Sequence, residues 1–110
     1  MDKQMRLGRI TLEDTQANHQ HVVFDLVYEG NLPKPSAFYF GLWQDKNEQS
    51  LCPFVMGPEG DCDFGTGYSG TDRIYQCNVL EVELAMGAEV EWRSEEYETR
   101  LRVVEISQLM

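Results

Sequence analysis

Apolar and polar residues alternate along most of this chain, and the alternation is clearest in its last quarter. In residues 89–93, Val90 and Trp92 alternate with charged residues, and residues 97–103 repeat the pattern after a polar break. A period of two turns one face of a strand toward the core and the other toward water. We therefore expect two antiparallel strands joined by a short turn at residues 94–96.

The same period predicts further strands upstream. Residues 7–13 and 21–29 alternate between apolar and polar residues, whereas residues 37–43 are apolar on both faces. A strand of the second kind is either covered on both sides or exposes one face to a partner. Residues 50–56 are expected to pair with it, and Pro53 places that strand at an edge or a bulge, because proline removes one ladder donor.

The segment between these strands and the final hairpin is less regular. Residues 57–71 carry five of the nine glycines and are predicted to be the longest irregular stretch of the chain. Long loops in compact domains often carry function, so this loop is a candidate site. Residues 72–84 are predicted to form a strand, bent near Asn78. A short helix over residues 79–86 is the alternative, because several of its apolar residues also have helical spacing.

About seven short strands predict an all-β fold, in one domain spanning residues 1–110 with a frayed N-terminus at residues 1–5. Two architectures fit this pattern. The first is a single small immunoglobulin-like β-sandwich, which we expect on the number of strands. The second is a compact β-barrel of mainly antiparallel strands.

Charge and cysteine content narrow the class of partner. Nineteen acidic residues against nine basic ones give a formal net charge of −10. Such a charge repels nucleic acids and anionic membranes and favours a basic protein partner. The N-terminus lacks the apolar core of a signal peptide, and the apolar runs are too short to span a bilayer. Three irregularly spaced cysteines indicate free thiols in a reducing cytoplasm.

The expected function is therefore that of a small acidic cytoplasmic protein-binding domain, such as an inhibitor or immunity protein that covers a basic partner. The predicted contacts are carboxylates of the C-terminal hairpin. They are Glu89, Glu91, Glu95, Glu96 and Glu98. The alternative for this surface is an ordinary solvated strand face, on which Arg93, Arg100 and Arg102 pair with the carboxylates across the strands.

A second function is suggested by the aromatic segment at residues 37–43. A strand face that exposes aromatic side chains favours self-association, as in an oligomerising structural or accessory subunit. Tyr39 and Trp43 are the predicted contact residues for this function.

A third function is that of a metal-binding module or a small enzyme. His19 and His21 lie two residues apart, so within one strand both rings would face the same side, as zinc or iron requires. Acidic residues of the glycine-rich loop offer the oxygen ligands that calcium takes. They are Glu59, Asp61, Asp63 and Asp72. The alternative is a pair of surface histidines and an ordinary acidic loop. Since no nucleophile stands beside a base in any recognisable motif, we expect neither catalysis nor a cofactor.

Overall fold

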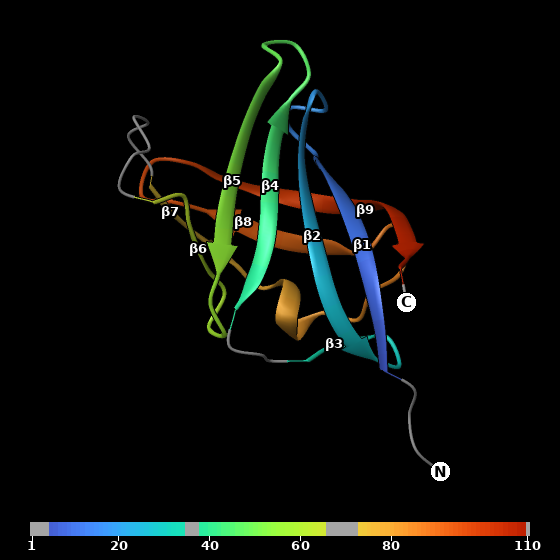
Figure 1. The fold of residues 1–110 in the computed structure, drawn as a ribbon. Coiled ribbons are helices and arrows are strands. Elements are labelled where there is room, and N and C mark those ends of the chain that lie inside the picture. The colour runs from blue at the N-terminus through green and yellow to red at the C-terminus, as the bar shows by residue number, and fades with distance from the viewer. Residues whose placement is uncertain (1–4, 35–37, 66–72, 110) are drawn as a thin grey trace.

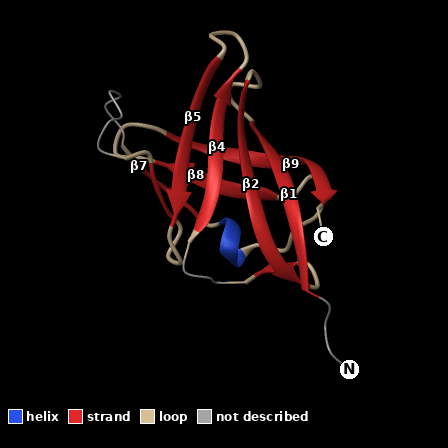
Figure 2. Cartoon of the chain, in the orientation of Figure 1, coloured by secondary structure: helices blue, strands red, loops and turns tan. Residues whose placement is uncertain are grey.

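The computed structural model of the chain describes residues 5–34, 38–65 and 73–109. In these residues the chain forms nine strands and one short 3₁₀ helix, η1 (Val79–Glu81). Figure 2 colours the strands red and the helix blue. The strands are β1 (Met5–Asp14), β2 (Gln20–Glu29), β3 (Leu32–Pro33), β4 (Tyr39–Asp45), β5 (Ser50–Met56), β6 (Asp61–Asp63), β7 (Ile74–Cys77), β8 (Glu89–Arg93) and β9 (Glu98–Gln108).

Eight of these strands close into an antiparallel β-barrel (Figure 1). Each strand pairs with its neighbour in the chain, in the order β1, β2, β4, β5, β6, β7, β8 and β9, and β1 also pairs with β9. The short strand β3 is added to β2 outside this ring. The all-β prediction is confirmed, and of its two architectures the chain adopts the barrel. The sandwich is excluded because β1 pairs with both β2 and β9, which closes the sheet.

Two departures from the predicted strands have local causes. The loop predicted at residues 57–71 contains β6, which pairs with β5 only at Val55 and Met56. Pro53 therefore lies where β5 has no described neighbour on its β6 side, consistent with the predicted edge position. The strand predicted over residues 72–84 ends at Cys77 and is followed by η1, so neither the long strand nor the longer helix forms.

Inward-pointing side chains fill the barrel, and all eight of its strands contribute buried apolar residues. Near the centre, the rings of Phe24 and Phe54 meet edge to face, with centroids 5.4 Å apart. The ring of Phe54 also lies 5.7 Å from that of Trp92 across the barrel. Edge-to-face contacts of this kind add specific geometry to the burial of apolar surface.

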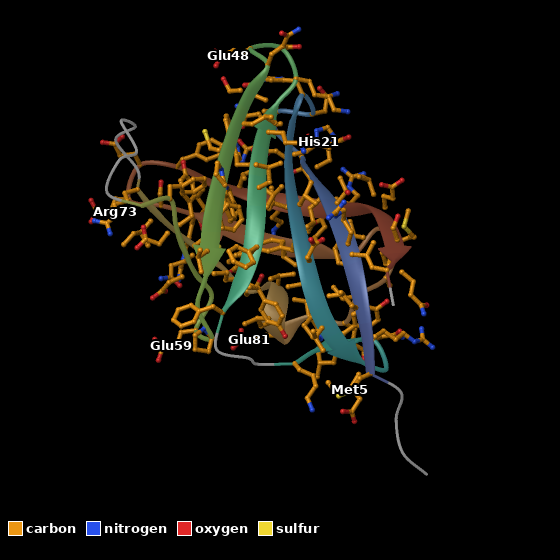
Figure 3. All side chains as sticks on the ribbon, in the orientation of Figure 1. Met5, His21, Glu48, Glu59, Arg73 and Glu81 are labelled. Atoms are coloured by element: carbon orange, nitrogen blue, oxygen red, sulfur yellow. The ribbon has the colours of Figure 1, made fainter. Side chains whose placement is uncertain are left out.

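One end of the barrel is closed. The helix η1 contacts β3, and Leu84 N donates a hydrogen bond to Asn31 O across the same region. Val79 of η1 is fully buried, and Tyr28 and Tyr39, from the ends of β2 and β4, are also buried. Figure 3 labels Glu81 in η1 and Glu48 in the β4–β5 turn at opposite ends of the molecule. Among the described residues, no helix is long and apolar enough to cross a membrane.

Gly41 faces the barrel interior, directly opposite Phe54 in the neighbouring strand. A methyl group at Gly41 would lie 2.2 Å from Cζ of Phe54. Gly41→Ala is expected to lower the free energy of unfolding by about 1–2 kcal/mol, because the ring must move within a filled core. In a Phe54→Leu background the same substitution should cost close to nothing in urea unfolding. An equal cost in both backgrounds would show that the Phe54 ring is not the obstacle.

All three cysteines are free thiols, as predicted. Cys62 and Cys77 are buried, whereas Cys52 is half-buried. Burial raises the pKa of both buried thiols, that of Cys77 to about 12. These two thiols therefore stay protonated and unreactive near neutral pH.

Candidate functional site

Alternate turns of an up-and-down barrel gather at the same end, because neighbouring strands run in opposite directions. The end away from η1 carries the β1–β2 turn (residues 15–19), the β4–β5 turn (residues 46–49) and the β8–β9 turn (residues 94–97). Lys46 N donates a hydrogen bond to His19 O at 2.9 Å and so joins two of these turns, which lie side by side at the top of Figure 1.

A cavity of about 380 Å³ opens at this end of the barrel. Most of its lining is aromatic, and the side chains come from strands and turns on several sides of the barrel. The lining residues are Ala17, His19, Gln20, Trp43, Phe64, Tyr75, Trp92 and Tyr97. We call this cavity the aromatic cup.

The strand alternation explains why these rings point inward. Trp43 follows the inward-facing Gly41 by two residues, Tyr75 precedes the buried Cys77 by two, and Trp92 follows the buried Val90 by two. Trp43 and Tyr75 therefore lie one layer beyond the packed core, at the level where the strands end. Trp92 is 2% exposed and belongs to the edge of the core itself.

Contacts between the rings hold the cup in shape. Tyr75 and Trp92 are stacked, with centroids 4.7 Å apart and planes inclined by 15°. Phe64 meets the edge of Tyr75 at 5.8 Å and also contacts Phe54 of the core at 5.0 Å. The cup is thus continuous with the core below it, and its rings are positioned without a ligand.

Asp14 lies behind one wall of the cup and is only 2% exposed. Its carboxylate accepts hydrogen bonds from the hydroxyl groups of Tyr97 and Thr99, each at 2.7 Å, and from Gln16 N at 2.9 Å. Burial, together with the hydrogen bond to Asp14 and its charge, raises the pKa of Tyr97 to about 12. The Tyr97 hydroxyl is therefore held neutral, and its ring is fixed against the cup.

Asp45 ends β4, which pairs with β2 on the side away from β1, and is 5% exposed. Its carboxylate accepts hydrogen bonds from Asn47 N at 2.9 Å, from Glu48 N at 3.2 Å and from Gln20 Nε2 at 3.3 Å. His19 Nε2 lies 3.7 Å from the same group. Burial acts to raise the pKa of Asp45, but the hydrogen bonds, led by that from Glu48, outweigh it and leave the pKa below its usual value.

The two predicted histidine ligands face different sides of the barrel. His19 lies in the turn before β2 and lines the cup, whereas His21 lines a groove on the outer surface. His21 Nε2 lies 3.6 Å from Glu13 Oε2, and burial, followed by the charge of Lys46, lowers the pKa of its imidazole. The expectation that both rings share one face fails because β2 begins only at Gln20.

The predicted calcium ligands have other partners. Asp61 accepts a hydrogen bond from Gln76 Nε2. Asp63 accepts two from Arg73, at 3.0 and 3.2 Å, and one from Gly65 N at 2.7 Å. The hydrogen bonds from Arg73 and then Gly65 lower the pKa of Asp63. Glu59 is exposed and Asp72 lies outside the described residues, and within the described part of the chain no three His, Cys, Asp or Glu side chains group as a metal site would require.

The predicted acidic contacts of the hairpin are all exposed, namely Glu89, Glu91, Glu95, Glu96 and Glu98. The register of β8 and β9 places Arg102 opposite Glu89, Arg100 opposite Glu91, and Arg93 opposite Glu98. Arg102 Nε lies 4.0 Å from Glu89 Oε2. The arginines therefore offset the carboxylates along the strands, and the excess of negative charge lies at the turn.

The aromatic strand presents different residues to solvent than the sequence indicates. Tyr39 is buried at the closed end, where its hydroxyl donates to the backbone oxygens of Lys34 and Val27. Trp43 points into the cup. The ring of Phe40 is on the outer face instead and is 76% exposed. The physical reason is that inward and outward positions are assigned by the closure of the barrel.

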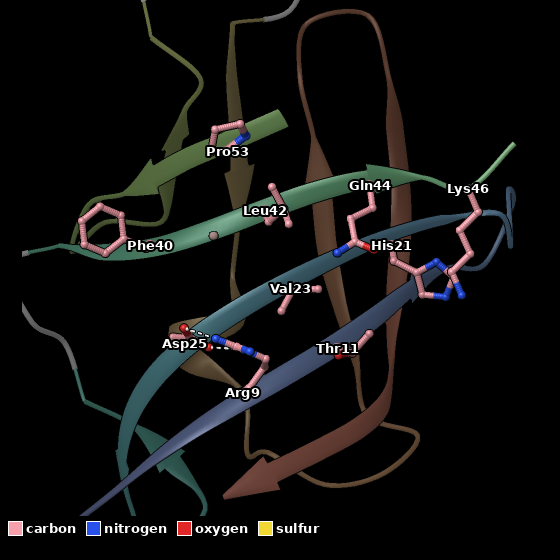
Figure 4. Close-up of a pocket in the computed structure, with 11 residues that line it drawn as sticks. Arg9, Thr11, His21, Val23, Asp25, Phe40, Leu42, Gln44, Lys46 and Pro53 are labelled. Carbon is pink, nitrogen blue, oxygen red and sulfur yellow. Dashed lines mark hydrogen bonds and ion pairs between the residues drawn. The ribbon is translucent and has the colours of Figure 1, made fainter. Parts of the chain in front are cut away.

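Phe40 lies at one end of a groove of about 550 Å³ on the outside of β1, β2, β4 and β5. Val23, Leu42 and Pro53 form its apolar floor, as Figure 4 shows. Charged groups border this floor: Arg9 and Asp25 form a hydrogen-bonded ion pair at 2.8 Å, and His21 and Lys46 line the other end. The groove is an open sheet face, whereas the cup is built from converging rings.

Sequence reasoning missed most of the cup, including Phe64, Tyr75, Trp92 and Tyr97 as site residues and the carboxylates behind it. One signal was available, since each of these aromatic residues lies next to a turn or a strand end. That signal becomes informative only when the turns are known to gather at one end. Comparisons of the chain with known protein families, curated proteins and solved structures found no match.

Proposed function

We propose that this protein is a non-catalytic binding domain whose ligand occupies the aromatic cup. The observation that carries the proposal is the convergence of five aromatic side chains around a cavity of about 380 Å³ at the open end of a closed barrel. Ligand sites of roughly 300–1,000 Å³, lined by apolar and aromatic groups with a few polar ones, are common at barrel mouths. Eight-stranded barrels have room for a small ligand at most.

The polar groups of the cup favour binding over catalysis. Among the described lining residues, His19 is the one imidazole, and its nearest ionic partner is Asp45 at 3.7 Å. Covalent catalysis would need a hydroxyl, thiol or amine nucleophile within hydrogen-bond reach of such a base. The side chains of Gln20 and His19 instead provide hydrogen-bonding groups at the rim of an aromatic surface, as a site for orienting a ligand requires.

The two tryptophans of the chain, Trp43 and Trp92, both line the cup, so their indole N–H signals in NMR report its occupancy. In a screen of cationic, neutral aromatic and anionic fragments, we expect binders to shift both signals. Trp43→Ala should weaken each such binder by about fivefold or more, because stacking on an aromatic ring contributes roughly 1–3 kcal/mol. The remaining Trp92 signal serves as the readout.

Phe40→Ala is the matched control, because Phe40 is an aromatic residue of the same strand that points outward into the groove. It should leave fragment binding at the cup unchanged. Fragments that shift neither indole signal, or that lose affinity in Phe40→Ala and not in Trp43→Ala, would contradict a binding site in the cup.

Recognition of a basic protein partner by the acidic hairpin is the second candidate function. It is favoured by the exposure of Glu95 and Glu96 in the β8–β9 turn and of Glu98 at the start of β9, opposite Arg93. Replacing all three with lysine should weaken binding of a lysine-rich peptide more than the same change at Glu48, Glu59 and Glu83, which gives an equal net charge. Titrations at low and high salt measure this. Equal losses in the two variants would show that only net charge matters.

A reducing cytoplasm remains the proposed location. The support for it is that Cys52, Cys62 and Cys77 are free, which is usual for proteins of reducing compartments.

A further inference from the structure

The faces of the cup's rings favour one kind of ligand. The π-system of an aromatic ring is negative on its face, so a cation placed within about 6 Å of the ring centre is attracted to it. Trp43, Tyr75, Trp92 and Tyr97 line the same cavity. Tyr75 and Trp92 cover one face of each other by stacking, and Trp92 is 2% exposed, so Trp43, Tyr97 and the outer side of Tyr75 carry most of this attraction. Tryptophan and tyrosine are the rings that bind cations best, and several of them around one cavity replace part of the hydration that a cation loses.

The charges around the cup also favour a cationic ligand. None of the described residues that line it is a lysine or an arginine. Two nearly buried carboxylates lie immediately behind its lining: Asp14 accepts a hydrogen bond from Tyr97, and Asp45 accepts one from Gln20. Opposite charges interact more strongly in such poorly solvated surroundings than they do in bulk water. The net charge of −10 adds a long-range attraction for cations.

The hydrogen bond from Tyr97 to Asp14 strengthens this effect. A phenol that donates to a carboxylate carries more electron density on its ring than one that donates to water. At 2.7 Å, this hydrogen bond is of the short, charge-assisted type. The ring of Tyr97, which lines the cup, is therefore more electron-rich than that of a tyrosine hydrogen-bonded to water.

We propose that the ligand of the aromatic cup is a small organic cation of the quaternary or methylated ammonium class. This inference rests on the proposed function, because it assumes that the cup is a binding site. A methylated ammonium group is apolar on its surface and positive overall, which matches aromatic faces in front of buried carboxylates. An inorganic cation or a primary amine keeps a strong hydration shell and would need oxygen ligands in direct contact with it.

Two other ligand classes fit less well. An anionic ligand, such as a nucleotide, would meet the two carboxylates without a lysine or arginine in the described lining to offset them. A neutral planar ligand could stack on Tyr75 and Trp92, but it would gain nothing from Asp14 or Asp45. The proposal is therefore tested by comparing the affinities of a cation and of a neutral molecule of the same shape.

Choline and 3,3-dimethylbutan-1-ol form such a pair, because they differ in a nitrogen replaced by carbon and hence in charge alone. We expect choline to shift the indole signals of Trp43 and Trp92 and the neutral alcohol to bind at least about tenfold more weakly. The titrations are made at one fixed pH of about 8, at which both compounds keep their charge states. Equal affinity for the two compounds would overturn the cation proposal and leave the cup as a binding site.

The other outcomes separate the two proposals. If neutral aromatic fragments bind in the cup and choline does not, the ligand class proposed here is wrong and the proposed function stands. If no fragment of any class shifts either indole signal, both proposals fail together.

Asp45→Asn tests the source of the attraction. Asparagine keeps an oxygen that can accept hydrogen bonds from Asn47 N and Glu48 N, so the β4–β5 turn is retained. We expect choline to bind several-fold more weakly to this variant, while a neutral aromatic fragment binds as to the unchanged protein. An unchanged affinity for choline would overturn the assignment of Asp45 as a counter-charge for the ligand.

Discussion

Asp14→Asn is expected to lower the free energy of unfolding by about 2–3 kcal/mol, measured by urea denaturation near neutral pH. The carboxylate of Asp14 is buried and accepts hydrogen bonds from Tyr97, Thr99 and Gln16 N, so it joins the end of β1 to β9 and to the β8–β9 turn. Asparagine keeps one accepting oxygen, but it replaces the second with an amide donor and removes the charge. Hydrogen bonds to charged groups are roughly twice as strong as those between neutral groups.

The same substitution is expected to lower the pKa of Tyr97 from about 12 toward the ordinary phenol value, because the charge of Asp14 would no longer oppose its ionisation, although burial still would. In the unchanged protein the folded-state pKa of Tyr97 lies above its unfolded value. This residue therefore contributes stability that is complete below about pH 10 and is lost as the pH rises toward 12. In Asp14→Asn this stability should be lost over a narrower range of pH. NMR titration of the tyrosine ring carbons follows the ionisation of Tyr97 directly.

Asp25→Asn is the matched control for Asp14→Asn. Asp25 forms an ion pair with Arg9 on the outer face of the barrel, where 38% of its side chain is exposed. Exposed ion pairs contribute about 1 kcal/mol or less, so this variant should lose little stability. Similar losses from the two substitutions would contradict the role given to the buried network.

Gly60→Ala is expected to have the largest effect of a single methyl group, at about 3 kcal/mol or more. Gly60 has a φ of +89°, which alanine rarely adopts, and a methyl group there would lie 2.2 Å from the backbone oxygen of Cys77. Cys77 N also donates a hydrogen bond to Gly60 O at 3.0 Å, so the two backbones are held together. Because the obstacle is backbone and not the tip of a side chain, it cannot move without breaking this contact.

Gly87→Ala is the control that separates the cost of a positive φ from the cost of the steric clash. Gly87 has a similar φ of +85°, but a methyl group there would have no atom within 4 Å. This control should cost only the 1–2 kcal/mol or so of a left-handed conformation. Thermal or urea unfolding of both variants gives the comparison. If Gly60→Ala costs no more than Gly87→Ala, the close approach of Gly60 to Cys77 is not a constraint on the fold.

Most strands could be predicted from the sequence, because the alternation of apolar and polar residues involves only near neighbours. Alternation placed β2 within one residue of its observed start, placed β5 at its observed bounds, and predicted the hairpin of β8 and β9. It also put Arg93, Arg100 and Arg102 opposite carboxylates. The prediction was weakest at residues 57–84, where β6 is three residues long and η1 forms after Cys77. Elements this short have too few residues to show a period.

The candidate site was harder to predict from the sequence, for a different reason. Trp43 and Trp92 are both inward-facing, but alternation alone cannot say whether an inward ring belongs to the core or to a cavity. Trp43 was predicted to contact a partner on an exposed strand face, whereas it lines the cup. Asp14 and Asp45 were not predicted at all, because an acidic residue at the end of a strand resembles any other turn residue.

What the sequence determined by itself is therefore most of the strands, the alternation of side chains between the two faces of each, and the strong negative charge. What only the tertiary structure decided is the closure of β1 onto β9, the closing of one end by η1, and the gathering of the turns at the other. The physical reason is that alternation depends on near neighbours, whereas closure depends on pairing between residues far apart in the chain, such as Gly8 and Gln108, which are 100 positions apart. The aromatic cup and its two carboxylates exist only after that closure.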